Sequence, residues 1–251
     1  MKKILCILLI SWNLMQCYSA KPTSFESNKD YLKSHDLCHQ RQNYTVMAPA
    51  VNDSKMAPSV QLLKMTLFYL EDSAITYNRK AKSVSEHLIK EPAINENHSE
   101  EVHNFKERIE NFLEIYADCN GMEELFDLMD LYASITLEYY KLEKEKNLTV
   151  DGKIILDVLK KYDCETLNEE YISNIYVFTT HFAKKFDDIE EDLKNEEGEL
   201  PGKIIQWWNT AKNVKVYQDK FLELIKFLKL YKENKFECQN QLCEIFSSVK
   251  V

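Results

Sequence analysis

Residues that break regular structure are scarce in this chain. Only 4 glycines and 5 prolines occur among 251 residues, which leaves little material for the turns of sheet proteins or for a glycine-rich phosphate loop. From about residue 57 onward, apolar side chains recur at alternating steps of three and four residues, the spacing of a helix that buries one face. We therefore predict an all-α protein, built as an antiparallel helical bundle of about six or seven helices.

End signals and apolar stripes place these helices along the chain. Pro58 suits the first turn of a helix, and Asn120-Gly121 is typical of a left-handed cap that closes one. Thr166, followed three residues later by Glu169, has the form of a capping box. The expected stripes run over Val60 to Tyr77, Val102 to Tyr116, Leu125 to Leu142, 150–162, Ile172 to Leu193 and Ile204 to Tyr231, with a short helix over 237–247 and a polar link over 80–97, of which 82–90 can also be helical.

The N-terminus has the pattern of a secretory signal peptide. Lys2 and Lys3 precede an apolar run that is shorter than the roughly 20 residues of a membrane-spanning helix. Small side chains before Ala20 favour cleavage at that point, so we expect a secreted, extracellular protein without a membrane anchor. The expected organisation is a leader over 1–19, an extended N-terminal arm over 20–55 and a helical bundle domain over 56–251.

Four Asn-X-Ser/Thr sequons agree with a eukaryotic secretory route. All four fall in segments that we predict to be loops or helix starts, where a glycan is tolerated. The predicted glycosylation sites are Asn43, Asn52, Asn97 and Asn147.

Seven cysteines occur in the chain, and Cys6 and Cys17 would leave with the leader. An oxidising compartment favours disulfides, so we expect two pairs and one cysteine left over. Cys119 and Cys164 each lie near the end of an expected helix and are predicted to pair. The expected disulfide cysteines are Cys38, Cys119, Cys164, Cys238 and Cys243, with Cys38 joined to one of the last two.

Signals of a metal centre or an active site are weak. His35, Cys38 and His39 have side chains that suit zinc, but a closed site needs a fourth ligand, and export favours a disulfide at Cys38. No Gly-X-Ser-X-Gly motif, the usual setting of a hydrolase serine, occurs. We expect no metal, no cofactor and no enzymatic activity.

The chain is acidic, with a formal net charge of −9, which becomes −11 when Lys2 and Lys3 are removed with the leader. This charge disfavours nucleic-acid binding and favours a basic partner, or serves solubility alone. The densest acidic run is a candidate docking patch, although a solvated helix end is the simpler interpretation. It comprises Asp187, Asp188, Glu190, Glu191 and Asp192 and is continued by Glu196, Glu197 and Glu199.

Two adjacent tryptophans suggest an alternative function. Trp207 and Trp208, next to Ile204 and Ile205, could line a pocket for an apolar ligand inside the bundle, which would make the protein a carrier. Aromatic stripes on helices more often simply pack against each other.

The layout of leader, polar arm with sequons, acidic helical body and late cysteine pair Cys238-Gln239-Asn240-Gln241-Leu242-Cys243 resembles the 34-kilodalton mosquito salivary protein family. The resemblance covers the whole chain as architecture and composition, without a specific motif, so it transfers no functional residue. It implies a secreted, non-enzymatic effector that binds an extracellular protein or glycan, such as a host or cuticular macromolecule.

Overall fold

The computed structural model describes residues 56–119, 121–234 and 236, and this part of the chain is helical without strands. The all-α prediction is confirmed. The described residues form eight helices, one more than the upper end of the expected number, because one expected helix is divided and a short one precedes α4. The helices are α2 (Pro58–Leu88), α3 (Pro92–Asn95), α4 (Glu100–Asp118), α5 (Met122–Lys144), α6 (Val150–Lys161), α7 (Cys164–Asn195), α8 (Glu199–Ala211) and α9 (Tyr217–Glu233).

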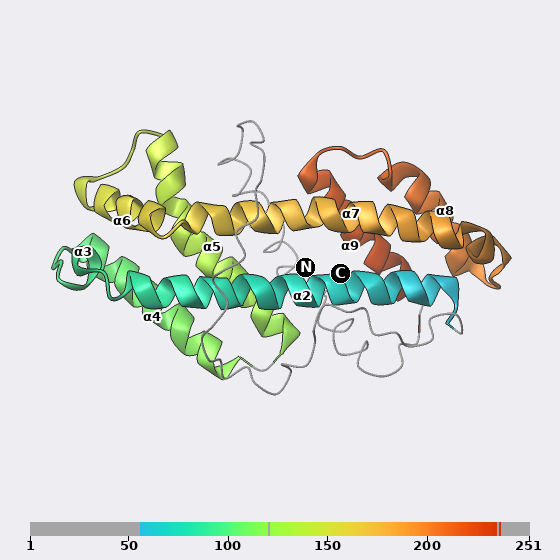
Figure 1. Cartoon of the computed structure of the whole chain (residues 1–251), viewed down its shortest axis with the longest axis horizontal. Helices are drawn as coiled ribbons and strands as arrows, with labels where there is room; N and C mark the ends of the chain where they lie inside the picture. Colours follow the sequence, from blue (N-terminus) through green and yellow to red (C-terminus); the bar gives the residue numbers. More distant parts are fainter. Residues whose placement is uncertain (1–55, 120, 235, 237–251) are drawn as a thin grey trace.

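Two long helices, α2 and α7, lie side by side along the length of the molecule (Figure 1). They run antiparallel, since the rings of Tyr69 and Phe178 stack with centroids 4.0 Å apart while Tyr77 donates a hydrogen bond to Asn168 at 2.9 Å. With 31 residues, α2 is about 46 Å long. Helices α3 to α6 cover one half of this pair, and α8 and α9 cover the other half (Figure 1).

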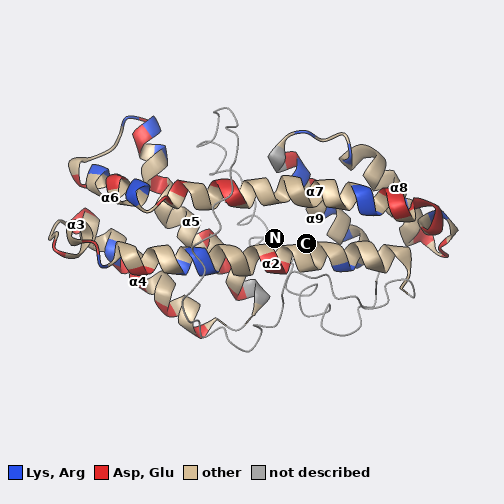
Figure 2. Cartoon of the chain, viewed as in Figure 1, with Lys and Arg blue, Asp and Glu red and all other residues tan. Residues whose placement is uncertain are grey.

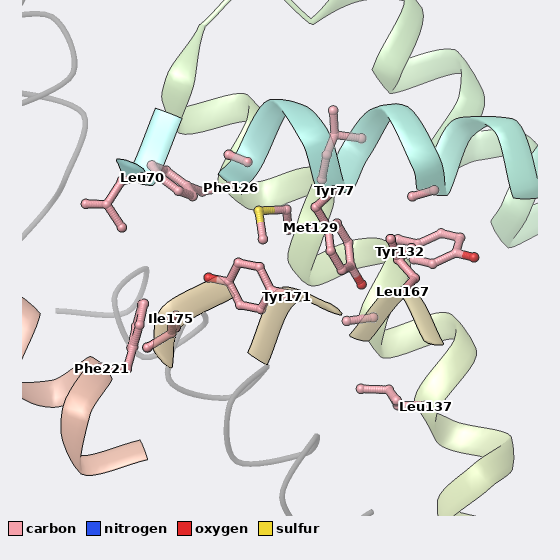
Figure 3. Packing of buried hydrophobic residues seen from close by; sticks show 14 of the residues in the cluster. Leu70, Tyr77, Phe126, Met129, Tyr132, Leu137, Leu167, Tyr171, Ile175 and Phe221 are labelled. Carbon is pink, nitrogen blue, oxygen red and sulfur yellow. The ribbon is translucent and has the colours of Figure 1, made fainter. Parts of the chain in front are cut away.

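Aromatic side chains from the three central helices meet in the core. Tyr77 of α2, Tyr132 of α5 and Tyr171 of α7 project toward one another (Figure 3). The Tyr77 ring makes edge contacts with both, at centroid distances of 6.1 Å to Tyr132 and 5.7 Å to Tyr171. The three rings bury a large apolar surface. The buried Tyr77 hydroxyl is not left unpaired, because it donates a hydrogen bond to Asn168.

The first helix continues beyond Tyr77, where the stripe of large apolar residues ends. Residues 80–97 were expected to be a polar link of which 82–90 can also be helical, and the structure agrees with the helical alternative, because α2 extends to Leu88. Ala81 and Leu88 are fully buried, so the helix keeps a core-facing stripe whose members are small or widely spaced. The outward face of the same segment is polar, which explains why its composition resembles that of a linker.

Two predicted caps are wrong. Helix α7 begins at Cys164, and its N-cap is Asp163 in the left-handed region with φ of 51°, so Thr166 lies inside the first turn. Burial explains the earlier start, because Cys164 is fully buried. Gly121 is extended, with φ of −134°, and is the N-cap of α5 rather than the left-handed cap of α4.

The helix expected over Ile204 to Tyr231 is divided into α8 and α9. Residues 212–216 separate the two, and Trp207 donates from its indole N–H to the carbonyl of Glu223 at 3.1 Å. In one continuous helix the 20 positions from Trp207 to Phe227 would span about 30 Å. In the fold, the centroids of these two rings are 4.8 Å apart. The turn therefore lets α8 and α9 bury their aromatic faces against each other.

The predicted Cys119–Cys164 disulfide is wrong. Cys164 is a free, buried thiol, and its sulfur accepts a hydrogen bond from the Tyr132 hydroxyl at 3.6 Å. Cys119 is half-buried at the C-terminus of α4, where its thiol donates to the carbonyl of Gly121 at 3.8 Å. The two sulfurs thus face different surroundings. Cys38, Cys238 and Cys243 lie outside the described residues, as do the leader, the arm over 20–55 and the helix expected over 237–247.

Candidate functional site

The predicted docking patch lies in the last turns of α7. Asp187, Asp188, Glu191 and Asp192 are exposed, and Glu190 is half-buried. The buried residues of this segment, Phe182, Phe186, Ile189 and Leu193, occupy the opposite side of the helix. Acidic residues gather where α7 ends and α8 begins (Figure 2). The three-four spacing thus orients the carboxylates toward solvent.

One lysine offsets part of this charge. Lys194 lies 2.8 Å from Glu191 and 3.1 Å from Glu190, and hydrogen bonds with Glu191 and Glu190 raise the pKa of Lys194. Among the described residues it is the one cation that pairs with the five acids of the patch. Carboxylates at a helix C-terminus oppose the helix dipole, which costs a few tenths of a kcal/mol for each exposed charge. Asp187, Asp188 and Asp192 therefore remain available to a partner.

Glu196, which continues the acidic run, has a structural role that the sequence did not reveal. Its carboxylate accepts the backbone N–H of Ser59 at 2.9 Å and the Ser59 hydroxyl at 2.5 Å. The N-cap of α2, Ala57, makes no side-chain cap. Glu196 thus satisfies one of the unpaired N–H groups at the start of α2 from a position 137 residues away in sequence. It does not belong to the exposed patch.

Two of the four predicted glycosylation sites fall in described loops. Asn147 is exposed before α6, and the Thr149 hydroxyl of its sequon accepts the N–H of Gly152 at 2.8 Å as the N-cap. Asn97 is half-buried, and its side chain accepts the N–H of Ser99 at 2.9 Å. Asn147 is therefore the more accessible acceptor. Asn43 and Asn52 lie outside the described residues.

Aromatic rings surround the two tryptophans that suggested a ligand pocket. Phe182 of α7 lies 5.7 Å from Trp207 and 5.3 Å from Trp208 between ring centroids. Phe186 stacks on Trp208 at 5.1 Å, and Phe227 of α9 contacts Trp207. These contacts occupy the space between α7, α8 and α9, so they favour packing over a ligand site.

A surface depression that the sequence did not indicate lies between α4, α5 and α6. It is open and has a volume of about 480 Å³. Its lining combines acidic groups with one arginine, one amide and two aromatic rings: Glu100, Glu101, Asn104, Phe105, Arg108, Glu138, Tyr139 and Asp151. Because these residues come from three helices, no local sequence motif brings them together.

The side chains of the depression are held by specific contacts. Arg108 pairs with Glu138 at 2.7 Å, and Thr149 donates its hydroxyl to Glu101 at 2.5 Å. The ring of Tyr139 meets that of Phe105 edge-on, at 5.5 Å between centroids and 89° between planes. Burial, Glu138 and Glu101 raise the pKa of Tyr139 to about 12, so its hydroxyl stays protonated at physiological pH.

Within the described residues, no group of three His, Cys, Asp or Glu side chains is arranged to hold a metal ion. No helix in this part of the chain has the length and apolar character needed to cross a membrane. Searches with protein-family models, against curated proteins and against solved structures find no match to this chain.

Proposed function

We propose that this protein is a secreted, non-enzymatic effector that binds a basic extracellular macromolecule through the exposed acids of α7. The observation that carries the proposal is the row of solvent-facing carboxylates at 187, 188, 191 and 192, with Lys194 as the paired cation. Complementary charge steers association and selects partners. The resemblance to the mosquito salivary family supports a host or cuticular macromolecule as that partner.

The end of α7 is held rigidly by the core, and this makes the patch suitable for binding. Every acid of the patch lies on one continuous helix that is anchored by Phe182, Phe186 and Leu193 in the core. Charges on a rigid element lose little conformational freedom when a partner docks. The packed rings around Trp207 and Trp208 make a carrier of an apolar ligand the weaker alternative.

A charge-neutral variant tests the proposal, provided that Glu196 is left intact, because its loss would weaken the fold and imitate a loss of binding. The patch variant is Asp187→Asn, Asp188→Asn, Glu191→Gln and Asp192→Asn. The control removes four exposed charges from other helices and loops: Glu107→Gln, Glu114→Gln, Glu145→Gln and Asp157→Asn.

The full chain, secreted from eukaryotic cells, is immobilised, exposed to extracellular fluid and cuticle extract, and its captured partner is purified. We expect wild type and control to bind this partner alike, and the patch variant to bind at least about tenfold more weakly, which corresponds to about 1.4 kcal/mol. The difference in affinity between wild type and the patch variant should decrease at high salt, because salt screens the charges. Equal binding by all three proteins would refute the acidic patch, and a stoichiometric apolar molecule seen by native mass spectrometry would support the carrier.

A further inference from the structure

The depression between α4, α5 and α6 carries a strong local excess of negative charge. Glu100, Glu101, Glu138 and Asp151 supply four carboxylates against the single guanidinium of Arg108, a balance of −4 + 1 = −3. Arg108 is occupied by Glu138, and Glu101 accepts the Thr149 hydroxyl. The carboxylates of Glu100 and Asp151 pair with no cation among the described residues. The site therefore favours a positively charged occupant.

Tyr139 gives a second and independent indication of a ligand. Its side chain is only 4% exposed and lines the depression, yet its hydroxyl has no hydrogen-bond partner among the described residues. Glu138 and Glu101 line the same depression, and after burial their charges are the next causes that raise the pKa of Tyr139. The Tyr139 hydroxyl is not among the fully buried polar atoms that lack a partner, so its oxygen is accessible from the depression, where a bound group can form a hydrogen bond with it.

The chemistry of these groups distinguishes between kinds of cation. A metal ion needs several converging ligands, and the described residues offer no group of three His, Cys, Asp or Glu so arranged. An organic ammonium group carries three N–H donors, which match separate carboxylates and a phenol oxygen. The volume of about 480 Å³ falls within the usual range for small-molecule sites. Since the carboxylates come from three helices, a molecule with several ammonium groups can reach more of them than one with a single charge.

We propose that this depression binds a small organic polyamine, with Glu100 and Asp151 pairing with ammonium groups and the Tyr139 hydroxyl accepting a hydrogen bond from one of them. This site is separate from the acidic end of α7 and does not rest on the function proposed above. Its occupant is a small molecule, and the packed interior of the bundle is not involved.

Isothermal titration calorimetry of the full secreted chain with spermidine tests the proposal at constant ionic strength. We expect saturable binding by wild type and at least tenfold weaker binding by Tyr139→Phe, which removes only the hydroxyl. Glu100→Gln combined with Asp151→Asn should weaken binding further. As a matched control, Glu114→Gln combined with Glu145→Gln removes two exposed charges outside the depression and should bind spermidine as wild type does.

Two further measurements separate a built site from general attraction between charges. Tyr139→Phe should unfold at the wild-type temperature without spermidine, because its hydroxyl loses no partner within the protein. Mg²⁺ at matched ionic strength should leave spermidine binding within about twofold of its original affinity. In the calorimetry, the proposal is overturned by undetectable spermidine binding, by equal affinity of wild type and Tyr139→Phe, or by equal losses of affinity in the depression and control variants. It is also overturned if Mg²⁺ displaces spermidine, or if Tyr139→Phe unfolds at a lower temperature than wild type without ligand.

Discussion

The contact between Glu196 and the start of α2 leads to a sharp prediction about stability. Glu196 follows α7 and accepts two hydrogen bonds from Ser59, one from the backbone N–H and one from the hydroxyl. The carbonyl of the same Ser59 accepts the buried hydroxyl of Tyr231 at 2.7 Å. Three helices distant in sequence thus meet at one residue that is only 2% exposed. We predict that Glu196→Ala destabilises the whole fold.

The magnitude follows from the groups that lose partners. Hydrogen bonds to a charged acceptor contribute about 1.5–3 kcal/mol, and loss of an N-terminal cap costs about 1 kcal/mol. Glu196 is only half-buried, so solvent offsets part of the loss, and we expect Glu196→Ala to cost about 2 kcal/mol. For a domain of this size, that corresponds to a fall of about 4–8 °C in Tm. Glu196→Gln keeps an acceptor without the charge, so its cost should be about half as large.

Thermal and urea unfolding of the secreted protein provide the assay. Glu197→Gln is the matched control, since it removes the same charge one residue away from an exposed position and should change stability by less than about 0.5 kcal/mol. Ser59→Ala removes the hydroxyl and keeps the backbone N–H, so it should cost less than Glu196→Ala. Equal unfolding temperatures for Glu196→Ala and Glu197→Gln would show that the tie between α2 and α7 does not contribute to stability.

Three more predictions concern other contacts. Phe182→Ala, at a position 1% exposed within the rings of α7, α8 and α9, should cost about 3–5 kcal/mol in urea unfolding. Thr149→Ala should lose both the glycan and about 1 kcal/mol of helix capping, whereas Thr149→Ser should keep both, as read from gel mobility and Tm. Hydrogen bonds from Lys161 and Tyr162 lower the pKa of Glu91, so this contact stabilises the fold above the ordinary pKa of 4.5 and is lost as pH falls through the lowered pKa. The destabilisation caused by Tyr162→Phe at neutral pH should therefore vanish in acid, when both proteins are unfolded over a pH series.

Periodicity predicted the fold class well because most helices carry a stripe of large apolar residues. Helices α4 and α6 match their expected positions closely, and Ser99 and Thr149 cap them. The method failed where tertiary packing decided the outcome. The break over 212–216 interrupts a stripe that continues in register, and it brings the rings of Trp207 and Phe227 to within 4.8 Å of each other. A contact of this kind depends on a neighbouring helix, and the periodicity of a single segment carries no information about it.

The same limit applies to the sites. The exposed acids of α7 were predicted because they are consecutive in sequence and their spacing places them on a solvent-facing surface. Glu196 was grouped with them, because its partner Ser59 lies at the other end of the described chain. Tyr139 was assigned to an apolar stripe, which its burial confirms, but its contacts with Phe105 and the nearby carboxylates depend on how α4, α5 and α6 pack.

The two proposed sites can be tested independently because the body of the molecule separates them. The depression lies between α4, α5 and α6, which cover one half of the α2–α7 pair, and the acidic end of α7 lies in the other half (Figure 1). From its start at Cys164, next to α6, to Asp188, α7 advances 24 residues, or about 36 Å. Charges at that separation are largely screened, since the Debye length is about 8 Å at physiological ionic strength. Effects of variants at the two ends should therefore add, and a patch variant that lost spermidine binding would mean that the amine binds the acidic surface as a whole.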